Sequence, residues 1–234
     1  MLALHSSLDR LPPPVAVAPT LARAIPSVRF APLPAAVGQV MVLREGQQLF
    51  NEGDRAERYY QVTRGTLRTL RLLPDGRRQV VDFHGPGETL GLSSGALHGF
   101  DAEAVTDATL VSHSLSGLVS RAEASPALTR QLLGTLTREL ASAQEQLLLL
   151  GRKTARERLA SFLLAMARKQ GREDGVELPM KRGDIADHLG LTVETISRLF
   201  AALKREGLIA LASVTEVVFH DPEALAAIGS CEAT

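Results

Sequence analysis

Cysteine and aromatic side chains are scarce in this chain of 234 residues, which has one cysteine, no tryptophan and 4% aromatic residues. The single Cys231 excludes an intramolecular disulfide and an iron–sulfur cluster held by four thiolates, and it suits a reducing compartment. No run of about 18 uncharged apolar residues is present, so we expect no membrane span. The N-terminus has no basic segment followed by an apolar core, so we expect a cytoplasmic protein.

An excess of charge of either sign is also absent, because 26 Lys and Arg balance 26 Asp and Glu. The distribution is uneven, however. Residues 151–212 carry 12 basic and 8 acidic residues, about +4, whereas the rest of the chain carries 14 and 18, about −4. Because phosphate contacts require positive charge, a nucleic-acid site is expected in the positive segment.

Residues 182–205, RGDIADHLGLTVETISRLFAALKR, have the pattern of a helix-turn-helix. Gly190 lies between the two expected helices, where glycine takes a positive φ at little cost. Thr192 follows as an N-cap of the second helix, and Ala186 is small where the helices touch. Apolar residues fall at the positions that pack two crossing helices together: Ile185, Leu189, Leu191, Ile196 and Leu199.

The second helix presents Glu194, Ser197 and Arg198 on one face, with Val193 at its leading edge. This face matches the major groove: Arg198 can bond guanine, Glu194 can accept from cytosine, and Val193 suits a thymine methyl. The alternative is an ordinary amphipathic helix pair with a solvated polar face. We expect contacts to the DNA backbone from Lys181, Arg182 and Thr192.

Lys181 departs from the usual pattern, because a Ser or Thr cap commonly opens the first helix of this motif. A phosphate contact is our interpretation of this lysine. The alternative is an uncapped, solvated helix end.

The N-terminal half predicts a Pro/Ala-rich mobile extension over residues 1–36 and then an antiparallel β-roll over residues 37–124. Asp75-Gly76 between two alternating segments indicates a hairpin. Strands are expected at Gln39–Leu43, Gln48–Phe50, Tyr59–Thr63, Thr66–Leu73, Arg77–Phe83, Ala102–Val105 and Leu110–Ser114.

A long helix is expected over residues 125–151, because Ser125 and Pro126 form an N-cap followed by a proline in the first turn. Its apolar residues recur at alternating spacings of three and four, which indicates a dimer seam. The alternative is that the seam packs against its own roll. The seam consists of Leu133, Leu136, Leu140, Ala143, Leu147 and Leu150.

The remaining chain predicts a winged helix-turn-helix over residues 152–222 and a tail over residues 223–234. Thr154 and Glu157 form a capping box that begins a new helix. A hairpin wing is expected from Gly207 and from the apolar segment Val217–Phe219. The fold class is thus α+β: a β-roll, a dimerisation helix and a winged helix-turn-helix.

The block TVETISR followed by EGLI resembles the recognition helix of the Crp/Fnr superfamily of bacterial transcription regulators, over about residues 38–220. Val193 before Glu194, with Ser197 and Arg198, resembles the Fnr and FixK branch, since the cyclic-AMP receptor branch has Arg and Gly at the Val193 and Ser197 positions. The resemblance implies a homodimer on palindromic TTGAT-N4-ATCAA-like sites. Ser197 and Val193 would lie near thymines, Arg198 on guanine and Glu194 on its paired cytosine.

The resemblance also implies RNA polymerase as a partner, with the hairpin tip at residues 75–78 and the roll surface as candidate contacts, and control linked to oxygen limitation or nitrogen oxides. The segment 87–92 resembles the phosphate-binding cassette of cyclic-nucleotide domains. In the family, a Glu and an Arg-Ser pair bind the ribose and phosphate, but here these places hold Leu92, Ala102 and Glu103. We therefore expect no cyclic-AMP response and no cofactor.

Two interpretations remain open. The first is an effector-independent dimeric regulator of FixK type. The second is a sensor of the same superfamily gated by haem, nitric oxide or a small metabolite. The histidines show no paired metal-ligand spacing, so no metal site is expected. No nucleophile elbow, zincin helix or Walker loop appears, so the sequence predicts no enzyme.

Overall fold

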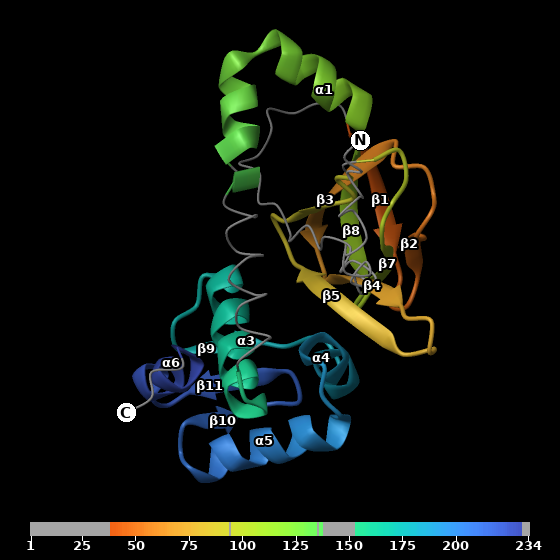
Figure 1. The fold of residues 1–234 in the computed structure, drawn as a ribbon. Helices are drawn as coiled ribbons and strands as arrows, with labels where there is room; N and C mark the ends of the chain where they lie inside the picture. The colour runs from red at the N-terminus through yellow and green to blue at the C-terminus, as the bar shows by residue number, and fades with distance from the viewer. Residues whose placement is uncertain (1–37, 94, 135, 138–152, 231–234) are drawn as a thin grey trace, which may run out of the picture.

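The computed structural model describes residues 38–93, 95–134, 136–137 and 153–230. The predicted extension at residues 1–36, Cys231 and the greater part of the predicted dimer helix lie outside these residues. Figure 1 shows two bodies, an upper β-roll and a smaller unit of helices and short strands below it.

The roll consists of two antiparallel four-stranded sheets, with strand orders β1-β8-β3-β6 and β2-β7-β4-β5. Its buried residues, among them Leu67, Ala102 and Leu110, form one apolar core between the sheets. The strands are β1 (Gln39–Leu43), β2 (Gln48–Phe50), β3 (Arg58–Arg64), β4 (Leu67–Leu72), β5 (Arg78–His84), β6 (Thr89–Leu90), β7 (Asp101–Ala104) and β8 (Ala108–Ser114).

All seven strands predicted for the roll are confirmed to within two residues at each end. Alternation explains this success, because along β8 buried residues alternate with partly exposed ones. The predicted β4–β5 hairpin is also present: Gly76 has φ 81°, and the Asp75 carboxylate accepts a 3.0 Å hydrogen bond from the backbone N–H of Arg77.

Helix α1 (Leu115–Ala124) follows β8 and was not predicted. Ser114 caps it by accepting a 3.2 Å hydrogen bond from the N–H of Gly117, and this Ser-x-x-Gly signal has no acidic residue to complete a capping box. The next helix begins after Ser125 as predicted, and the Ser125 hydroxyl accepts from the N–H of Leu128 at 3.3 Å.

The lower unit contains four helices and a three-stranded sheet of order β10-β11-β9 among the described residues. The predicted capping box is present, since Thr154 N–H donates to Glu157 Oε2 at 2.8 Å and Glu157 N–H donates to the Thr154 hydroxyl at 3.4 Å. The elements are α3 (Ala155–Gln170), β9 (Gly175–Glu177), α4 (Arg182–Leu189), α5 (Val193–Arg205), β10 (Ile209–Leu211), β11 (Glu216–Phe219) and α6 (Pro222–Ser230).

The predicted tail over residues 223–234 is wrong in its first part, because residues 223–230 belong to α6. This helix buries Leu225 completely, and the Ser161 hydroxyl of α3 donates a 3.1 Å hydrogen bond to the carbonyl of Gly229. The segment was too short and too rich in alanine to show a clear helical period. Packing against α3 stabilises it instead.

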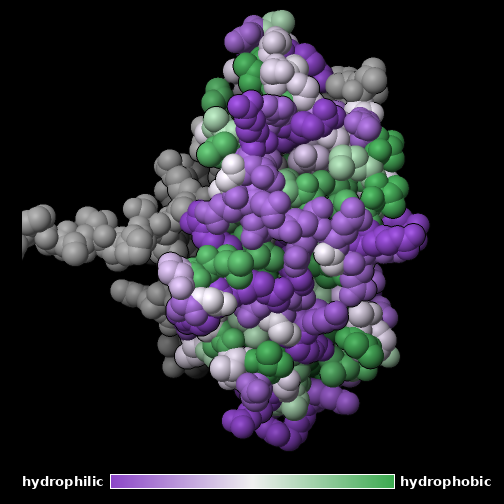
Figure 2. Space-filling model, turned by 90° about the vertical axis from the view of Figure 1, so that its right-hand side faces the viewer, coloured by the Kyte–Doolittle hydropathy of each residue, from purple (hydrophilic) through white to green (hydrophobic). Residues whose placement is uncertain are grey.

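The two bodies share one hydrophobic cluster. Leu70, Val80 and Phe83 of the roll belong to the same buried group as Phe162 and Ile185 of the lower unit. Figure 2 shows that hydrophobic residues on one face of the molecule form separate patches among hydrophilic ones. No helix in the described part of the chain has the length and apolar character needed to cross a membrane.

Candidate nucleic-acid interface

The predicted helix-turn-helix is formed by α4 and α5. Gly190 ends α4 in the left-handed conformation with φ 65°, and its N–H donates to the carbonyl of Ala186. Thr192 then caps α5, because its hydroxyl accepts a 3.2 Å hydrogen bond from the N–H of Thr195. The turn residues therefore perform the roles that their chemistry predicted.

The two helices are held together by the predicted apolar positions. Ile185 and Ile196 have no exposed surface, and Ala186 and Leu189 are buried beside them. Leu191 and Leu199 pack against the same cluster while partly buried. Phe200, which the sequence pattern did not single out, is also buried and lies under the side chain of Arg182.

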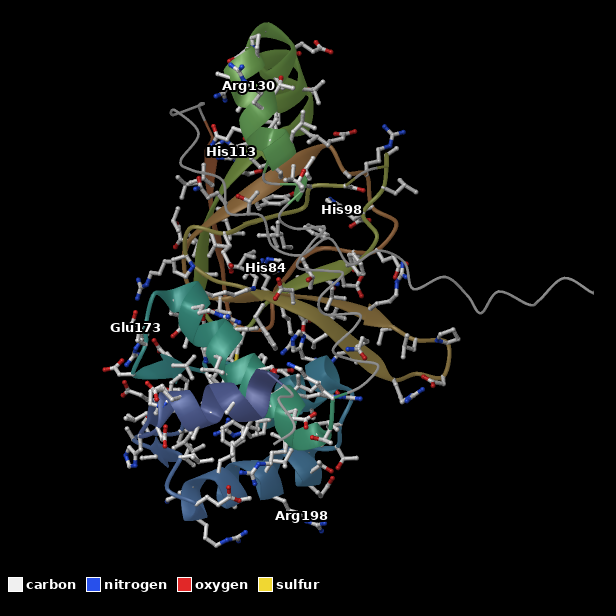
Figure 3. The ribbon with its side chains drawn as sticks, turned by 60° about the vertical axis from the view of Figure 1, so that its left-hand side comes forward. His84, His98, His113, Arg130, Glu173 and Arg198 are labelled. Carbon is white, nitrogen blue, oxygen red and sulfur yellow. The ribbon has the colours of Figure 1, made fainter. Side chains whose placement is uncertain are left out.

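The predicted base-contacting residues all lie on the exposed side of α5. Val193 is 45% exposed, and Glu194, Ser197 and Arg198 are exposed as well. Figure 3 shows Arg198 pointing away from the body of the protein at its lower end. The structure thus brings these four side chains together on one free face.

The polar groups of this face are prepared for hydrogen bonding. Glu194 lies in the first turn of α5, where its own backbone N–H and the hydroxyl of Thr192 hold its pKa below the usual value. The carboxylate is therefore an ionised acceptor, suited to a cytosine amino group. The Ser197 hydroxyl donates to the carbonyl of Val193 at 2.9 Å and keeps its lone pairs available.

The predicted backbone-contacting lysine and arginine differ in their surroundings. The Lys181 side chain is 84% exposed and lies 3.3 Å from the carboxylate of Glu45. The guanidinium of Arg182 stacks 3.6 Å from the ring centroid of Phe200, and burial lowers the pKa of Arg182. Arg182 therefore has a packing partner that the sequence did not reveal, in addition to its predicted phosphate contact.

The start of α4 is not an uncapped end. The carboxylate of Asp184 accepts a 3.2 Å hydrogen bond from the backbone N–H of Lys181, as the acidic half of a capping box would. This arrangement replaces the missing Ser or Thr. It leaves the ammonium of Lys181 free of any capping role.

The comparisons with known proteins agree with this geometry. Residues 157–228 match the Crp-like helix-turn-helix domain, and residues 40–121 match the cyclic nucleotide-binding domain. The nitrogen fixation regulation protein FixK of Rhizobium meliloti is 42% identical over 80% of this chain and 85% of its own length. The chain belongs to the Crp/Fnr family of transcription regulators.

Other relatives place this Crp/Fnr protein in the FixK-like branch. The FixK protein of Azorhizobium caulinodans is 42% identical over 87% of this chain and 84% of its own length. The solved structure of FixK2 from Bradyrhizobium japonicum superposes with a TM-score of 0.80 at 37% identity, covering 85% of this chain and all of that one. This regulator is therefore not an enzyme, and its α+β fold is that of the family.

The cassette of this Crp/Fnr protein has the expected backbone. Gly87 and Gly91 have φ 85° and 86°, and a side chain on Gly91 would lie 3.0 Å from the ring of Tyr60. The ligand positions are different. Ala102 is completely buried in the roll core, and Glu103 pairs with Arg68 of the neighbouring strand.

The histidines of the roll have ordinary packing or hydrogen-bonding partners. His98 stacks 3.8 Å from Phe50, and His113 stacks 5.0 Å from Tyr59. Nε2 of His84 lies 3.1 Å from the hydroxyl of Thr69, and Figure 3 shows His84 where the roll meets the lower helices. Within the described residues, no three His, Cys, Asp or Glu side chains gather as metal ligands would.

The seam of the predicted dimer helix is described only at its start. Leu133 is 57% exposed and Leu136 is 49% exposed, so neither is covered by its own roll. The rest of the predicted seam, Leu140, Ala143, Leu147 and Leu150, lies outside the described residues.

The sequence did not indicate the ion pairs that join the two bodies. Arg68 and Arg78 of the roll contact Asp184 of α4, which is more than 100 residues away in the chain. No local pattern marks such partners, because each residue alone has the appearance of a solvated charge on a strand or helix.

Proposed function

We propose that this regulator acts in the cytoplasm as a homodimer that binds palindromic TTGAT-N4-ATCAA-like promoter sites without cyclic nucleotide, and that it mainly activates transcription. The exposed face of α5 carries this proposal, because its four side chains match that half-site. Activators such as AadR of Rhodopseudomonas palustris and FnrL of Cereibacter sphaeroides are among its relatives. Control linked to oxygen limitation or nitrogen oxides is part of the proposal.

The base contacts follow from the chemistry of each side chain. Arg198 bonds guanine O6 and N7, Glu194 accepts from the paired cytosine, and Val193 and Ser197 lie against the thymines. Lys181, Arg182 and the residues around Thr192 neutralise or bond phosphates of the DNA backbone. The local excess of positive charge in residues 151–212 supports this assignment.

Dimerisation is supported by the exposed leucines. Leu133 and Leu136 would leave two large apolar side chains in water unless a partner covers them. A two-fold dimer also places two recognition helices about 34 Å apart on one face of DNA, which a palindromic site requires.

Independence from cyclic nucleotide is supported by the cassette. A cyclic phosphate requires a cation and N–H donors, and a ribose requires an acceptor. Ala102 supplies a methyl group, Leu92 an apolar side chain, and Glu103 a negative charge. The carboxylate of Glu103 is paired with Arg68, so this position offers no cation to a phosphate anion.

RNA polymerase is the proposed further partner. The tip of the β4–β5 hairpin projects from the roll, and Leu72 is 62% exposed beside it. Arg78, which belonged to the predicted contact, is engaged with α4. The proposed contact on the hairpin is therefore moved to residues 72–77, which leaves out Arg78 and includes the exposed Leu72.

Fluorescence anisotropy with purified, nucleotide-free protein tests the proposed function. We expect specific binding to a TTGAT-N4-ATCAA duplex, and a loss of about 1–3 kcal/mol for each half-site whose G·C pair is changed to A·T. Sedimentation of the complex should give two chains per duplex. Binding that ignores the change, or one chain per duplex, would refute the proposal.

An absorption spectrum of the purified protein distinguishes the proposed effector-independent regulator from the alternative, a gated sensor. Colourless protein that binds this duplex supports the effector-independent regulator. A Soret band, or binding that appears only after haem or nitric oxide is added, would contradict the effector-independent regulator and support the gated sensor.

A further inference from the structure

Five charged side chains meet where the roll contacts the helix-turn-helix. β4 and β5 supply arginines, β7 supplies a glutamate, and α4 supplies two aspartates. They are Arg68, Arg78, Glu103, Asp184 and Asp187.

Asp184 is the centre of this network. Its Oδ1 lies 2.6 Å from a guanidinium nitrogen of Arg68 and 2.6 Å from one of Arg78. Arg78 also donates from Nε to Asp187 at 2.9 Å. Arg68 in turn is held by Glu103, its cross-strand neighbour, through a 2.6 Å hydrogen bond from Nε. Two arginines of the roll are therefore paired with carboxylates on one turn of α4.

Burial makes this network sensitive to geometry. The Asp184 side chain is 4% exposed and that of Arg68 is 14% exposed. Charges removed from water in this way are stable only when their partners are in place, so small displacements are costly. Because Asp184 also accepts from the N–H of Lys181, the network fixes the first turn of α4 and not only a flexible side chain.

Contacts from side chains to backbone carbonyls extend the contact between the roll and α4 along β5. The side chain of Gln79 donates to the carbonyl of His188 at 3.3 Å, and Nδ1 of His188 lies 3.2 Å from the carbonyl of Val80. Phe83 packs 5.5 Å from the His188 ring. Helix α4 is thus held at both its first and its last turn.

The contact leaves the recognition helix free. Figure 1 shows α4 directly below β5 and α5 at the far end of the molecule. Val193 and Arg198 remain exposed, and Arg198 points away from the roll in Figure 3. This orientation therefore leaves the proposed DNA-reading face of α5 open to solvent.

We propose that Arg68 and Arg78 are positioning residues for DNA recognition, which hold the helix-turn-helix on the roll in its DNA-reading orientation without a ligand. The inference rests on the proposed function. Its physical reason is that a dimer reads a palindrome only when both recognition helices have the correct spacing. If the competent orientation is only partly populated, the apparent affinity falls by that fraction.

The full-length variant Arg78→Gln tests this role, with Arg77→Gln as the matched control. The Arg77 side chain is 78% exposed and pairs with Asp75 of its own turn. We expect Arg78→Gln to weaken binding to the palindromic duplex about tenfold, a usual size for coupling between sites. Arg77→Gln should bind as the wild type does.

A second variant approaches the contact from the other side. Asp187→Asn should also weaken binding, and the double variant Arg78→Gln/Asp187→Asn should lose no more than Arg78→Gln alone, because the two residues act through one contact. Arg78→Gln combined with Arg198→Ala should instead show additive losses. Arg78→Lys, which keeps the charge, should recover part of the affinity.

Hydrogen exchange without DNA gives an independent measurement. Arg78→Gln should speed exchange in α4 and β5 but not in the α3 and α6 amides, and Arg77→Gln should change neither. Unchanged or tighter DNA binding by both Arg78→Gln and Asp187→Asn would overturn the positioning role, even if Arg198→Ala loses base discrimination. Failure of the wild type to prefer the palindrome would refute the proposed function, whatever the exchange result.

Discussion

The two helices of the DNA-binding motif place their polar side chains in different surroundings. α5 presents Glu194, Ser197 and Arg198 to solvent, and the positive charge of Arg198 helps to lower the pKa of Glu194. α4 instead buries Asp184 among arginines from another body of the protein. The difference separates two proposed tasks: the side chains proposed to read DNA stay exposed to solvent, whereas the side chains proposed to fix the orientation of the motif are buried and paired.

Removing the buried carboxylate of Asp184 should have the largest effect on stability. Asp184→Ala leaves two arginines without their carboxylate, and we expect the free energy of unfolding to fall by about 3–5 kcal/mol. Chemical denaturation measures this change. The control Asp187→Ala removes a carboxylate that is 31% exposed and should cost clearly less. Equal losses would show that burial does not distinguish the two aspartates.

A substitution on the exposed face of α5 should affect DNA recognition and not the stability of the fold. Arg198→Ala is expected to reduce discrimination at the guanine by about 1–3 kcal/mol, because a bidentate contact to that base is lost. Its unfolding curve should match the wild type. Binding to matched and G-to-A duplexes measures the effect, and unchanged discrimination would mean that Arg198 does not contact that base.

Lys181 and Arg182 are adjacent in the chain but should differ in their effect on stability. Arg182→Ala should lower the free energy of unfolding by about 1 kcal/mol, since it removes the stacking on Phe200. Lys181→Ala should leave stability within about 0.5 kcal/mol. Both should weaken all DNA sequences alike and lower the slope of log K against log salt by about one. A sequence-dependent loss would exclude a phosphate contact.

A further expected effect concerns the pH dependence of stability. Burial holds the pKa of His84 and of His188 below the usual value, with Asp82 opposing that shift. The unfolded chain therefore binds more protons below about pH 6.5, so stability is full above that pH and falls as the solution is acidified. The slope should reach at most about 1.4 kcal/mol per pH unit for each imidazole.

Denaturation at several pH values between 5.5 and 7.5 checks this expectation. His84→Gln should flatten the curve, whereas His220→Gln, at an exposed position, should not. A curve that rises on acidification would contradict the assigned direction.

Local features of the chain could be predicted from the sequence. The face of α5 follows from helical spacing and from the turn at Gly190 and Thr192, which are local features. The strands of the roll follow from alternation and turn residues in the same way. Contacts across the fold are different, because neither Arg78 nor Asp184 carries a signal for the other.

One error and one contact missed by the sequence have the same physical origin. Helix α6 forms because α3 buries Leu225, and Arg182 is half-buried because Phe200 happens to lie beneath it. Both depend on tertiary packing and not on a local pattern. The predicted seam of the long helix is described only at Leu133 and Leu136, so the dimer remains a prediction.

Selection of bound duplexes from a random DNA pool, with purified protein and no added nucleotide, tests whether this regulator recognises a symmetric site without an effector. We expect a two-fold symmetric consensus with TTGAT half-sites separated by four base pairs. A half-site without symmetry, a consensus lacking the guanine that faces Arg198, or enrichment only when cyclic AMP is added would contradict it.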